Sequence, residues 1–290
     1  MQDVSKKNMP LVGAHLSIAG GIENSFDHAL SVGATCFQIF TRSSRSWNSK
    51  LYSDLEIAAF KAAQERSGID VVVSHAPYLI NLASATESVR KGSVELLTAE
   101  LHRAESLGLN AVVLHPGSHG GAGEDVGIDL FAAGLTEVFK NAPGDSVVAL
   151  ETMAGQGTSL GSTLESLKKI SDAVGFSSRI KFCLDTCHIA SAGYDISSAA
   201  KIGLFLDQFN AVLGLDRLAV IHVNGSSTPQ GSRVDRHSML DQGFIPREVF
   251  VAIMNDSRLA HLPKILETPA EREGTTYSGE ISWLKSVCGK

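Results

Sequence analysis

Short apolar runs that stop at a histidine, aspartate or glutamate recur along this sequence, and they constrain the fold more than any other feature. Seven runs show this pattern, at residues 11–15, 70–75, 110–115, 146–151, 180–185, 218–223 and 263–267. An eighth run, at residues 35–40, is similar but lacks such an ending. A polar side chain in a buried strand is costly unless a partner satisfies it. Because this cost recurs at the same end of nearly every run, we expect one shared site there.

The runs themselves are typical of a parallel sheet. Several are almost continuous in valine, leucine and isoleucine, as strands buried on both faces are. Helical stretches alternate with the runs, and glycine follows several of these stretches as a stop signal. The expected helices cover residues 24–32, 54–66, 85–107, 125–140, 162–174, 197–213, 246–254 and 278–287.

Eight strand–helix units in 290 residues predict an α/β fold, the (β/α)8 TIM barrel. The carboxyl ends of all strands meet on one face of such a barrel, so the polar endings would form a metal cluster on that face. A doubly wound open sheet is the alternative, but it would gather ligands at a single switch point. No Pro- or Ser-rich linker divides the chain, and we expect a single TIM-barrel domain over residues 1–290.

Composition limits the cellular context. Four cysteines do not make a disulfide framework in a chain of this length, and we expect them to be reduced. The first residues lack the apolar core of a signal peptide, and no run approaches the roughly 20 apolar residues of a membrane span. We therefore expect a cytoplasmic protein with no membrane partner. The formal net charge of −6 argues against broad nonspecific binding to nucleic acid, although bound divalent cations would offset much of it.

Nine side chains have the type and position of metal ligands. A single zinc ion takes about four ligands, so nine that include bridging carboxylates suit roughly two or three ions. Asp235 and His237 flank Arg236 in a long loop at residues 224–244, and in extended backbone they would point to the same side. The nine are His75, His115, Glu151, Asp185, His188, His222, Asp235, His237 and Glu267.

A cluster of this kind suits phosphodiester hydrolysis. Two metal ions roughly 3.5–4 Å apart clamp the attacking and leaving oxygens of an in-line displacement and lower the pKa of a bound water. Glu151 and Glu267 are candidates to bridge the ions or to orient the attacking hydroxide. Among the other histidines, we expect His15 and His119 to lie near the site, where each would either contact the ligands or substrate or have an ordinary structural role.

The motifs together resemble the endonuclease IV family of zinc-dependent apurinic/apyrimidinic endonucleases, which have a xylose-isomerase-like TIM barrel. The likeness covers nearly the whole chain, and the expected residue types occupy all nine ligand positions of that family. The matching segments are GAHLSIAGG (13–21), HAPYLINLA (75–83), HPGSH (115–119), ETMAGQG (151–157), LDTCHIASAGYD (184–195), SRVDRH (232–237) and ILET (265–268).

The resemblance implies three Zn²⁺ ions per chain, with Mn²⁺ as an alternative at some sites. It implies hydrolysis of the phosphodiester 5′ of an abasic site in duplex DNA to leave a 3′-hydroxyl, with a metal-bridging hydroxide as the nucleophile. Trimming of blocked 3′ ends is also implied, and catalytic roles fall to Glu151, Glu267 and His115. The first zinc would be held by His75, His115 and Glu151, the second by Glu151, Asp185, His222 and Glu267, and the third by His188, Asp235 and His237.

Damage recognition also follows from the resemblance. The family inserts side chains into the gap left by a missing base, and Arg45, Tyr78 and Leu79 occupy the matching positions. Such insertion costs least where the base stack is already weakened. The chain departs from the family at Gly225, often aspartate, and at Asp241, usually glycine. Neither departure removes a ligand, so both bear on rate and DNA affinity. The family also implies a monomer.

A metal-dependent sugar isomerase or epimerase on a related barrel is the alternative function. Such enzymes also place glutamate, aspartate and histidine at strand ends around one or two divalent ions. They need no third site, so His188 together with Asp235 and His237 favours the endonuclease. A protein that binds metal or DNA without catalysis is a further alternative, and the complete ligand set argues against it.

Overall fold

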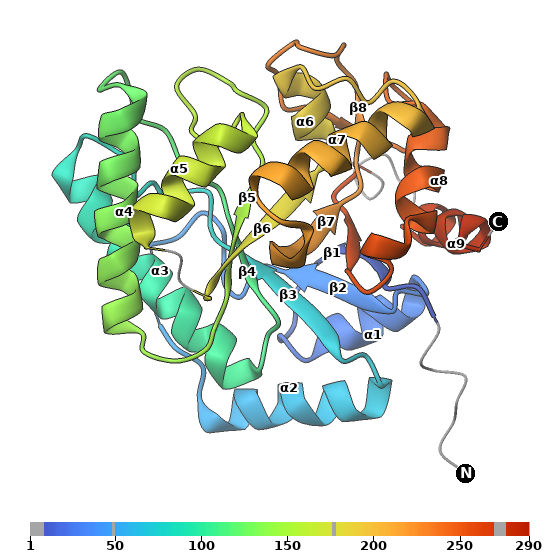
Figure 1. Cartoon of the computed structure of the whole chain (residues 1–290). Helices are drawn as coiled ribbons and strands as arrows, with labels where there is room; N and C mark the ends of the chain where they lie inside the picture. The colour runs from blue at the N-terminus through green and yellow to red at the C-terminus, as the bar shows by residue number, and fades with distance from the viewer. Residues whose placement is uncertain (1–8, 48–49, 176–177, 270–276, 290) are drawn as a thin grey trace.

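Eight parallel strands close into a barrel in the part of the chain that the structure describes (Figure 1). The computed structural model describes residues 9–47, 50–175, 178–269 and 277–289. Consecutive strands are neighbours from β1 to β7, and β10 closes the ring between β7 and β1, which confirms the predicted (β/α)8 barrel. The strands are β1 (Val12–Leu16), β2 (Cys36–Ile39), β3 (Val71–His75), β4 (Val112–Leu114), β5 (Val148–Glu151), β6 (Ile180–Asp185), β7 (Leu218–His222) and β10 (Lys264–Leu266).

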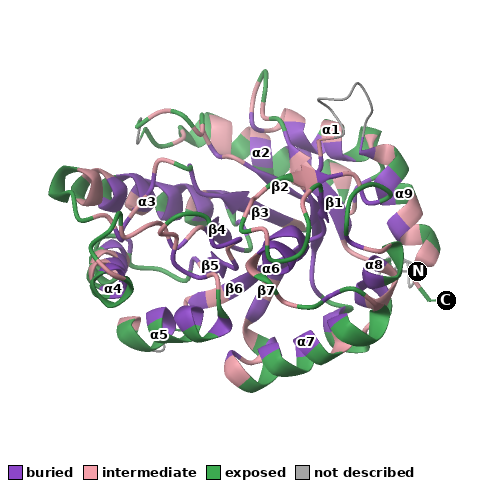
Figure 2. Cartoon of the chain, turned by 90° about the horizontal axis from the view of Figure 1, so that it is seen from above, coloured by how far each residue is buried: buried purple, intermediate pink, exposed green. Residues whose placement is uncertain are grey.

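Helices surround the barrel, with buried residues facing the strands and exposed residues facing outward (Figure 2). Local sequence explains where they begin and end. Ser53 and Glu56 form a reciprocal capping box at the start of α2, and Gly68 ends that helix with left-handed backbone at φ 66°. None of the helices in the described ranges is long and apolar enough to cross a membrane. The helices are α1 (Asn24–Ser31), α2 (Asp54–Ser67), α3 (Glu87–Leu107), α4 (Glu124–Asn141), α5 (Leu164–Val174), α7 (Ala199–Val212), α8 (Arg247–Asn255) and α9 (Ser278–Val287), with 3₁₀ turns η2 (Leu215–Arg217) and η3 (Ser257–Leu259).

The connections after β6 and β7 contain elements that the sequence pattern did not predict. A short helix, α6 (Thr186–Ala192), begins directly after β6. The Asp185 carboxylate caps it by accepting a hydrogen bond from the His188 backbone N–H (3.0 Å). In the long loop, β8 (Gly225–Ser226) and β9 (His237–Ser238) form an antiparallel hairpin. These elements give the loops that carry His188 and His237 a defined backbone.

The hairpin explains why glycine occupies position 225. A Cβ there would lie 2.5 Å from the Met239 carbonyl oxygen, closer than real Cβ atoms approach. Gly243 is held in the same way, with φ 85° and a Cβ position 2.1 Å from the Ser226 carbonyl oxygen. Asp241 is exposed in the turn that follows β9. One departure from the family pattern, Gly225, therefore lies in the hairpin, and the other, Asp241, lies in the turn that follows it.

The ligand layer rests on an apolar layer inside the barrel. At its base, a Cβ at Gly13 in β1 would lie 1.7 Å from the Cys36 carbonyl oxygen, so only glycine fits there. Side chains on the same face of a strand recur every second residue. In most strands the residue two positions after the apolar-layer residue therefore also points inward, and many of the predicted ligands lie at that position. The apolar layer consists of Cys36, Val73, Ala111, Val113, Ala149, Cys183, Val220 and Ile265.

A buried ion pair on α3 anchors the connection between β2 and α2. Arg103 donates from Nη2 to Glu100 Oε1 (2.5 Å) and from Nε to Thr41 Oγ1 (2.8 Å). It also donates from Nη1 to the Lys50 carbonyl oxygen (3.0 Å). Glu100 and Arg103 are completely buried. One guanidinium therefore ties both ends of this connection to α3.

Replacing Arg103 with methionine would leave the Glu100 carboxylate buried without its partner. Breaking a buried pair costs about 3–5 kcal/mol, so we expect the free energy of unfolding in urea to fall by that amount. The double change Glu100→Gln with Arg103→Met should recover much of the loss, because no unpaired charge remains. As a control, Lys91→Met breaks the exposed Lys91–Glu87 pair on the same helix and should have little effect. Equally small losses for the two single variants would contradict the anchoring role.

Candidate metal centre

The nine predicted ligands converge at the carboxyl-terminal end of the barrel. Some stand at strand ends, such as His75 on β3 and Glu151 on β5, and others come from the loops that follow. Together they form a site with a buried floor and an open side. His75, Glu151, Asp185, His188 and His222 are fully buried, and His115, Asp235, His237 and Glu267 are partly exposed.

The donor atoms of these residues fall into overlapping groups that can each hold a metal ion. Within each group the donor atoms lie within 4.8 Å of one another. Asp235 lies 3.3 Å from both His188 Nε2 and His237 Nε2, and so joins the group that contains these two histidines. The groups include His75, His115 and Glu151; Glu151, Asp185, His222 and Glu267; and Asp185, His188 and His237.

Glu151 connects the groups, because its two oxygens face different histidines. Oε2 lies 3.3 Å from His75 Nε2 and 3.2 Å from His115 Nε2. Oε1 lies 3.2 Å from His222 Nδ1 and 3.2 Å from His188 Nδ1. A carboxylate placed in this way can donate one oxygen to each of two ions. The geometry is that of a bridging ligand.

Several imidazole nitrogens are oriented as metal donors. His75 and His188 each donate from Nδ1 to a backbone carbonyl oxygen (2.7 Å), which leaves Nε2 as the atom with a free lone pair. His237 donates from Nδ1 to the Glu267 carbonyl oxygen (3.1 Å). The Nε2 atoms of His188 and His237 are buried without a hydrogen-bond partner. Buried nitrogens in this state, beside carboxylates, fit a bound cation.

Comparison with known proteins identifies the family. A model described as a xylose isomerase-like TIM barrel matches residues 26–287. The probable endonuclease 4 of Geotalea daltonii is 44% identical over 259 residues, covering 89% of this chain and 91% of that protein. The probable endonuclease 4 of Chloroflexus aggregans is 41% identical over 280 residues, covering 96% of this chain and 98% of that protein. The chain belongs to the endonuclease 4 family.

Solved structures agree with this membership. The crystal structure of endonuclease IV from Thermus thermophilus superposes with a TM-score of 0.82 at 35% identity, covering 96% of this chain and 97% of that one. A D-tagatose 3-epimerase-like protein superposes with a TM-score of 0.70, but at 20% identity that likeness shows the fold alone. The barrel is thus shared by endonuclease 4 proteins and epimerase-like proteins, and the side chains must distinguish them.

Buried carboxylates and imidazoles lie side by side in this endonuclease 4 site, and each shifts the pKa of the other. Burial alone would raise the pKa of the Glu151 carboxyl, but His222 and other imidazoles hold that pKa well below its usual range. The pKa of Glu267 is held low in the same way. Burial lowers the pKa of His188, but the neighbouring Asp185 and further carboxylates outweigh it and hold that pKa well above its usual value. The carboxylates are therefore ionised and require neighbouring cations.

Two polar side chains that the sequence analysis did not single out hold the ligands in place. Asn224 donates to Asp185 Oδ2 (2.7 Å) and accepts from the Glu267 backbone N–H (2.7 Å). Gln38 donates from Nε2 to Glu267 Oε1 (2.6 Å). Asn224 follows His222 by two residues, which was a usable signal. Gln38 lies in the one apolar run that has no ligand at its end, so the sequence pattern offered no signal for it.

The two histidines expected near the site have different surroundings. His15 lies beside it, with Nδ1 3.3 Å from Glu267 Oε1 and its ring centroid 4.3 Å from that of Phe40. Burial lowers the pKa of His15, so its imidazole is neutral at physiological pH. His119 is engaged at the start of α4, where its Nδ1 accepts from the Gly123 N–H (3.0 Å).

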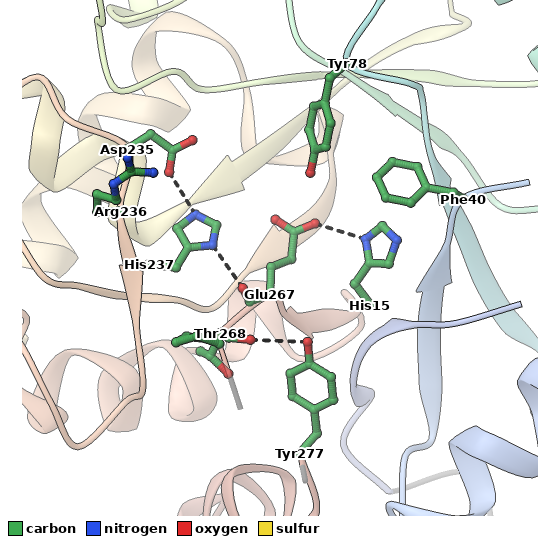
Figure 3. Close-up of a pocket in the computed structure, with 10 residues that line it drawn as sticks. His15, Phe40, Tyr78, Asp235, Arg236, His237, Glu267, Thr268 and Tyr277 are labelled. Atoms are coloured by element: carbon green, nitrogen blue, oxygen red, sulfur yellow. Dashed lines mark hydrogen bonds and ion pairs between the residues drawn. The ribbon is translucent and has the colours of Figure 1, made fainter. Parts of the chain in front are cut away.

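A cavity of about 400 Å³ opens beside the ligands (Figure 3). Tyr78 lines it and remains 62% exposed, with its ring 5.4 Å from that of His75. Leu79 is half-buried, and Arg45 is exposed on the connection between β2 and α2. The cavity is lined by His15, Phe40, Tyr78, Asp235, Arg236, His237, Glu267, Thr268, Pro269 and Tyr277.

Metal binding at this site is expected to weaken as the pH falls. Without a cation the pKa values of His188 and His222 lie above 6.5, so protons occupy these imidazoles and a metal must displace them. The apparent association constant should fall about tenfold per pH unit for each proton displaced. Competition with a chromophoric chelator between about pH 8 and about pH 6 measures this, with His28→Gln, a change at a partly exposed histidine on α1, as the control. An affinity that stays constant over this range would exclude such competition.

Proposed function

We propose that this protein is a deoxyribonuclease IV-type DNA repair enzyme that hydrolyses the phosphodiester 5′ of an abasic site in duplex DNA and leaves a 3′-hydroxyl. The observation that carries the proposal is the set of ligand groups joined through Glu151 beside an open cavity. Membership of the endonuclease 4 family supports the same reaction. We propose that residues 1–290 form one functional domain.

Three zinc ions fit the donors of the site. Imidazole and carboxylate ligands suit zinc, and the carboxylate-rich second group would also accept Mn²⁺. Bound zinc would lower the pKa of water and neutralise charge on the scissile phosphate. The first ion would be held by His75, His115 and Glu151, the second by Glu151, Asp185, His222 and Glu267, and the third by His188, Asp235 and His237.

The two glutamates have different exposures, and we assign them different roles. The Glu151 side chain is completely buried and touches histidines on both sides, so it acts as the bridge. Glu267 lines the cavity and is partly exposed, so it can reach a water molecule beside substrate. Its low pKa keeps it ionised at neutral pH, ready to orient the attacking water and accept its proton. His115 is also partly exposed and belongs to the first ligand group, so it would face the phosphate from the other side of Glu151.

The cavity rim would recognise the damaged duplex. Tyr78 presents an exposed aromatic ring beside the ligand groups, and Leu79 follows it on the same loop. Arg45 lies on the anchored connection after β2. We assign these side chains to the gap left by the missing base, where insertion displaces no stacked base.

The same site would trim blocked 3′ ends, because that reaction also hydrolyses a phosphoester at the 3′ oxygen of the preceding nucleotide. We propose that the enzyme works as a monomer on duplex DNA, with no membrane partner. A cytoplasmic location suits the four free cysteines.

A metal-dependent sugar isomerase or epimerase on the same barrel is the second candidate. The group of Glu151, Asp185, His222 and Glu267 favours it, because such enzymes use a comparable set around one or two ions. The additional contacts of Asp235 with His188 and His237 have no use in that chemistry. Removing Asp235 and His237 together therefore separates the two candidates. A repair nuclease should lose activity in this double variant, and an isomerase should retain it.

The decisive experiment is incision of a duplex that carries one stable abasic-site analogue, beside its undamaged twin. Zinc-loaded protein should cut just 5′ of the lesion, leave a 3′-hydroxyl and spare the undamaged strand. Glu267→Gln should lower kcat by about 10²- to 10⁴-fold, since it removes the proposed proton acceptor. No incision by folded, zinc-loaded protein would overturn the proposal, and sugar substrates would then be tested.

Tyr78→Ala tests damage recognition separately from chemistry. Loss of an inserted aromatic ring should weaken binding to the abasic duplex by about 1–3 kcal/mol. Fluorescence anisotropy at fixed salt measures the binding, and undamaged duplex shows whether the preference for damage has shrunk. Leu204→Ala, which removes an exposed side chain from the outer helix α7, is the matched control. An unchanged preference for abasic duplex would remove Tyr78 from recognition.

A further inference from the structure

Gln38 is a completely buried amide in β2, and each of its polar atoms contacts a predicted metal ligand. Its Nε2 donates to Glu267 Oε1 (2.6 Å) and to His15 Nδ1 (2.9 Å). Its Oε1 accepts from His222 Nε2 (2.9 Å). It follows the apolar-layer residue Cys36 by two positions, so it belongs to the same inward layer as the ligands. A polar group at this depth is costly unless such partners satisfy it.

The partners fix which way the amide faces. An ionised Glu267 can only accept hydrogen bonds, so the Gln38 nitrogen must face it. The Gln38 oxygen then faces His222, whose Nε2 must carry the proton.

When a metal displaces the second proton and the imidazole is neutral, the lone pair of His222 therefore lies on Nδ1. That atom is 3.2 Å from Glu151 Oε1 and 3.3 Å from Glu267 Oε2. His75 and His188 are oriented the opposite way, because their Nδ1 atoms donate to backbone carbonyl oxygens and leave Nε2 for metal. His222 thus differs from both in having its tautomer set by a side chain.

We propose that Gln38 is a positioning residue that fixes the tautomer of His222 and the orientation of Glu267, and so prepares the second metal group. The effect on turnover rests on the proposed nuclease function, whereas the effect on zinc binding does not. A methionine of similar volume could not form hydrogen bonds with Glu267 or His222. It would leave the His222 N–H buried without an acceptor and allow the imidazole to turn or change tautomer. A glutamate would still accept from His222 but would repel Glu267.

Three variants test the proposal in the full-length, zinc-loaded protein. Gln38→Met removes the contacts with Glu267, His15 and His222, and Gln38→Glu keeps the acceptor for His222. Gln64→Met is the control, since Gln64 is an amide on the outer helix α2. We expect Gln38→Met to weaken zinc binding about 10- to 100-fold. Its kcat on abasic duplex should fall while KM is retained, because Gln38 is buried away from DNA.

The tautomer itself is read by two-bond ¹H–¹⁵N correlation spectra of histidine-labelled protein, with His222 assigned by its substitution. The wild type and Gln38→Glu should carry the His222 proton on Nε2, and Gln38→Met should lose that pattern. Circular dichroism establishes that each variant is folded, and Gln38→Glu still tests the hydrogen bond if Gln38→Met fails to fold.

A His222 proton on Nδ1 in the wild type would overturn the proposal, as would unchanged zinc affinity in a folded Gln38→Met protein. These readouts need no nuclease substrate. Failure of the wild type to cut DNA, with the zinc and tautomer results as expected, would therefore reject the proposed function and support the role of Gln38 at the metal site.

Discussion

The rest of the site depends on a single buried carboxylate with two distinct sides. Glu151 has no exposed surface, yet its pKa is held low enough to keep it charged. A buried charge is tolerated only with close partners of opposite sign. Imidazoles from β3, from the residue after β4, from α6 and from β7 supply those partners, with two facing each oxygen. The positions of the surrounding ligands follow from the need to compensate this one charge from both sides.

Much of the fold, and the convergence of the predicted ligands on one face, followed from the sequence for a physical reason. A parallel barrel forces every strand to end on the same face, and the inward side chains of each strand alternate with the outward ones. Ala149 therefore places Glu151 above the apolar layer, and Val220 places His222 there. Local patterns also located the helices to within a few residues. The fold class and the convergence of the ligands were thus fixed by periodicity and chain direction.

What the sequence left open depends on contacts between distant segments. Asp185 doubles as the N-cap of α6, which no periodic pattern predicted because the helix is short. Gly225 departs from the family pattern, and only the packing of the hairpin against Met239 explains it. Gln38 was missed because it is not a metal ligand, although it occupies the inward layer that ligands use. The signal would have been its polarity at that position, rather than its ability to bind metal.

The ion pair beneath the β2–α2 connection bears on how tightly this protein can hold DNA. Arg103 fixes Thr41 and the Lys50 carbonyl from below, so both ends of the connection are ordered before any partner arrives. Flexible loops lose conformational entropy when they bind, and this loss subtracts from affinity. An anchored connection loses less, because its two ends are already held by α3. A buried charge pair on α3 would in this way raise affinity for DNA without touching it.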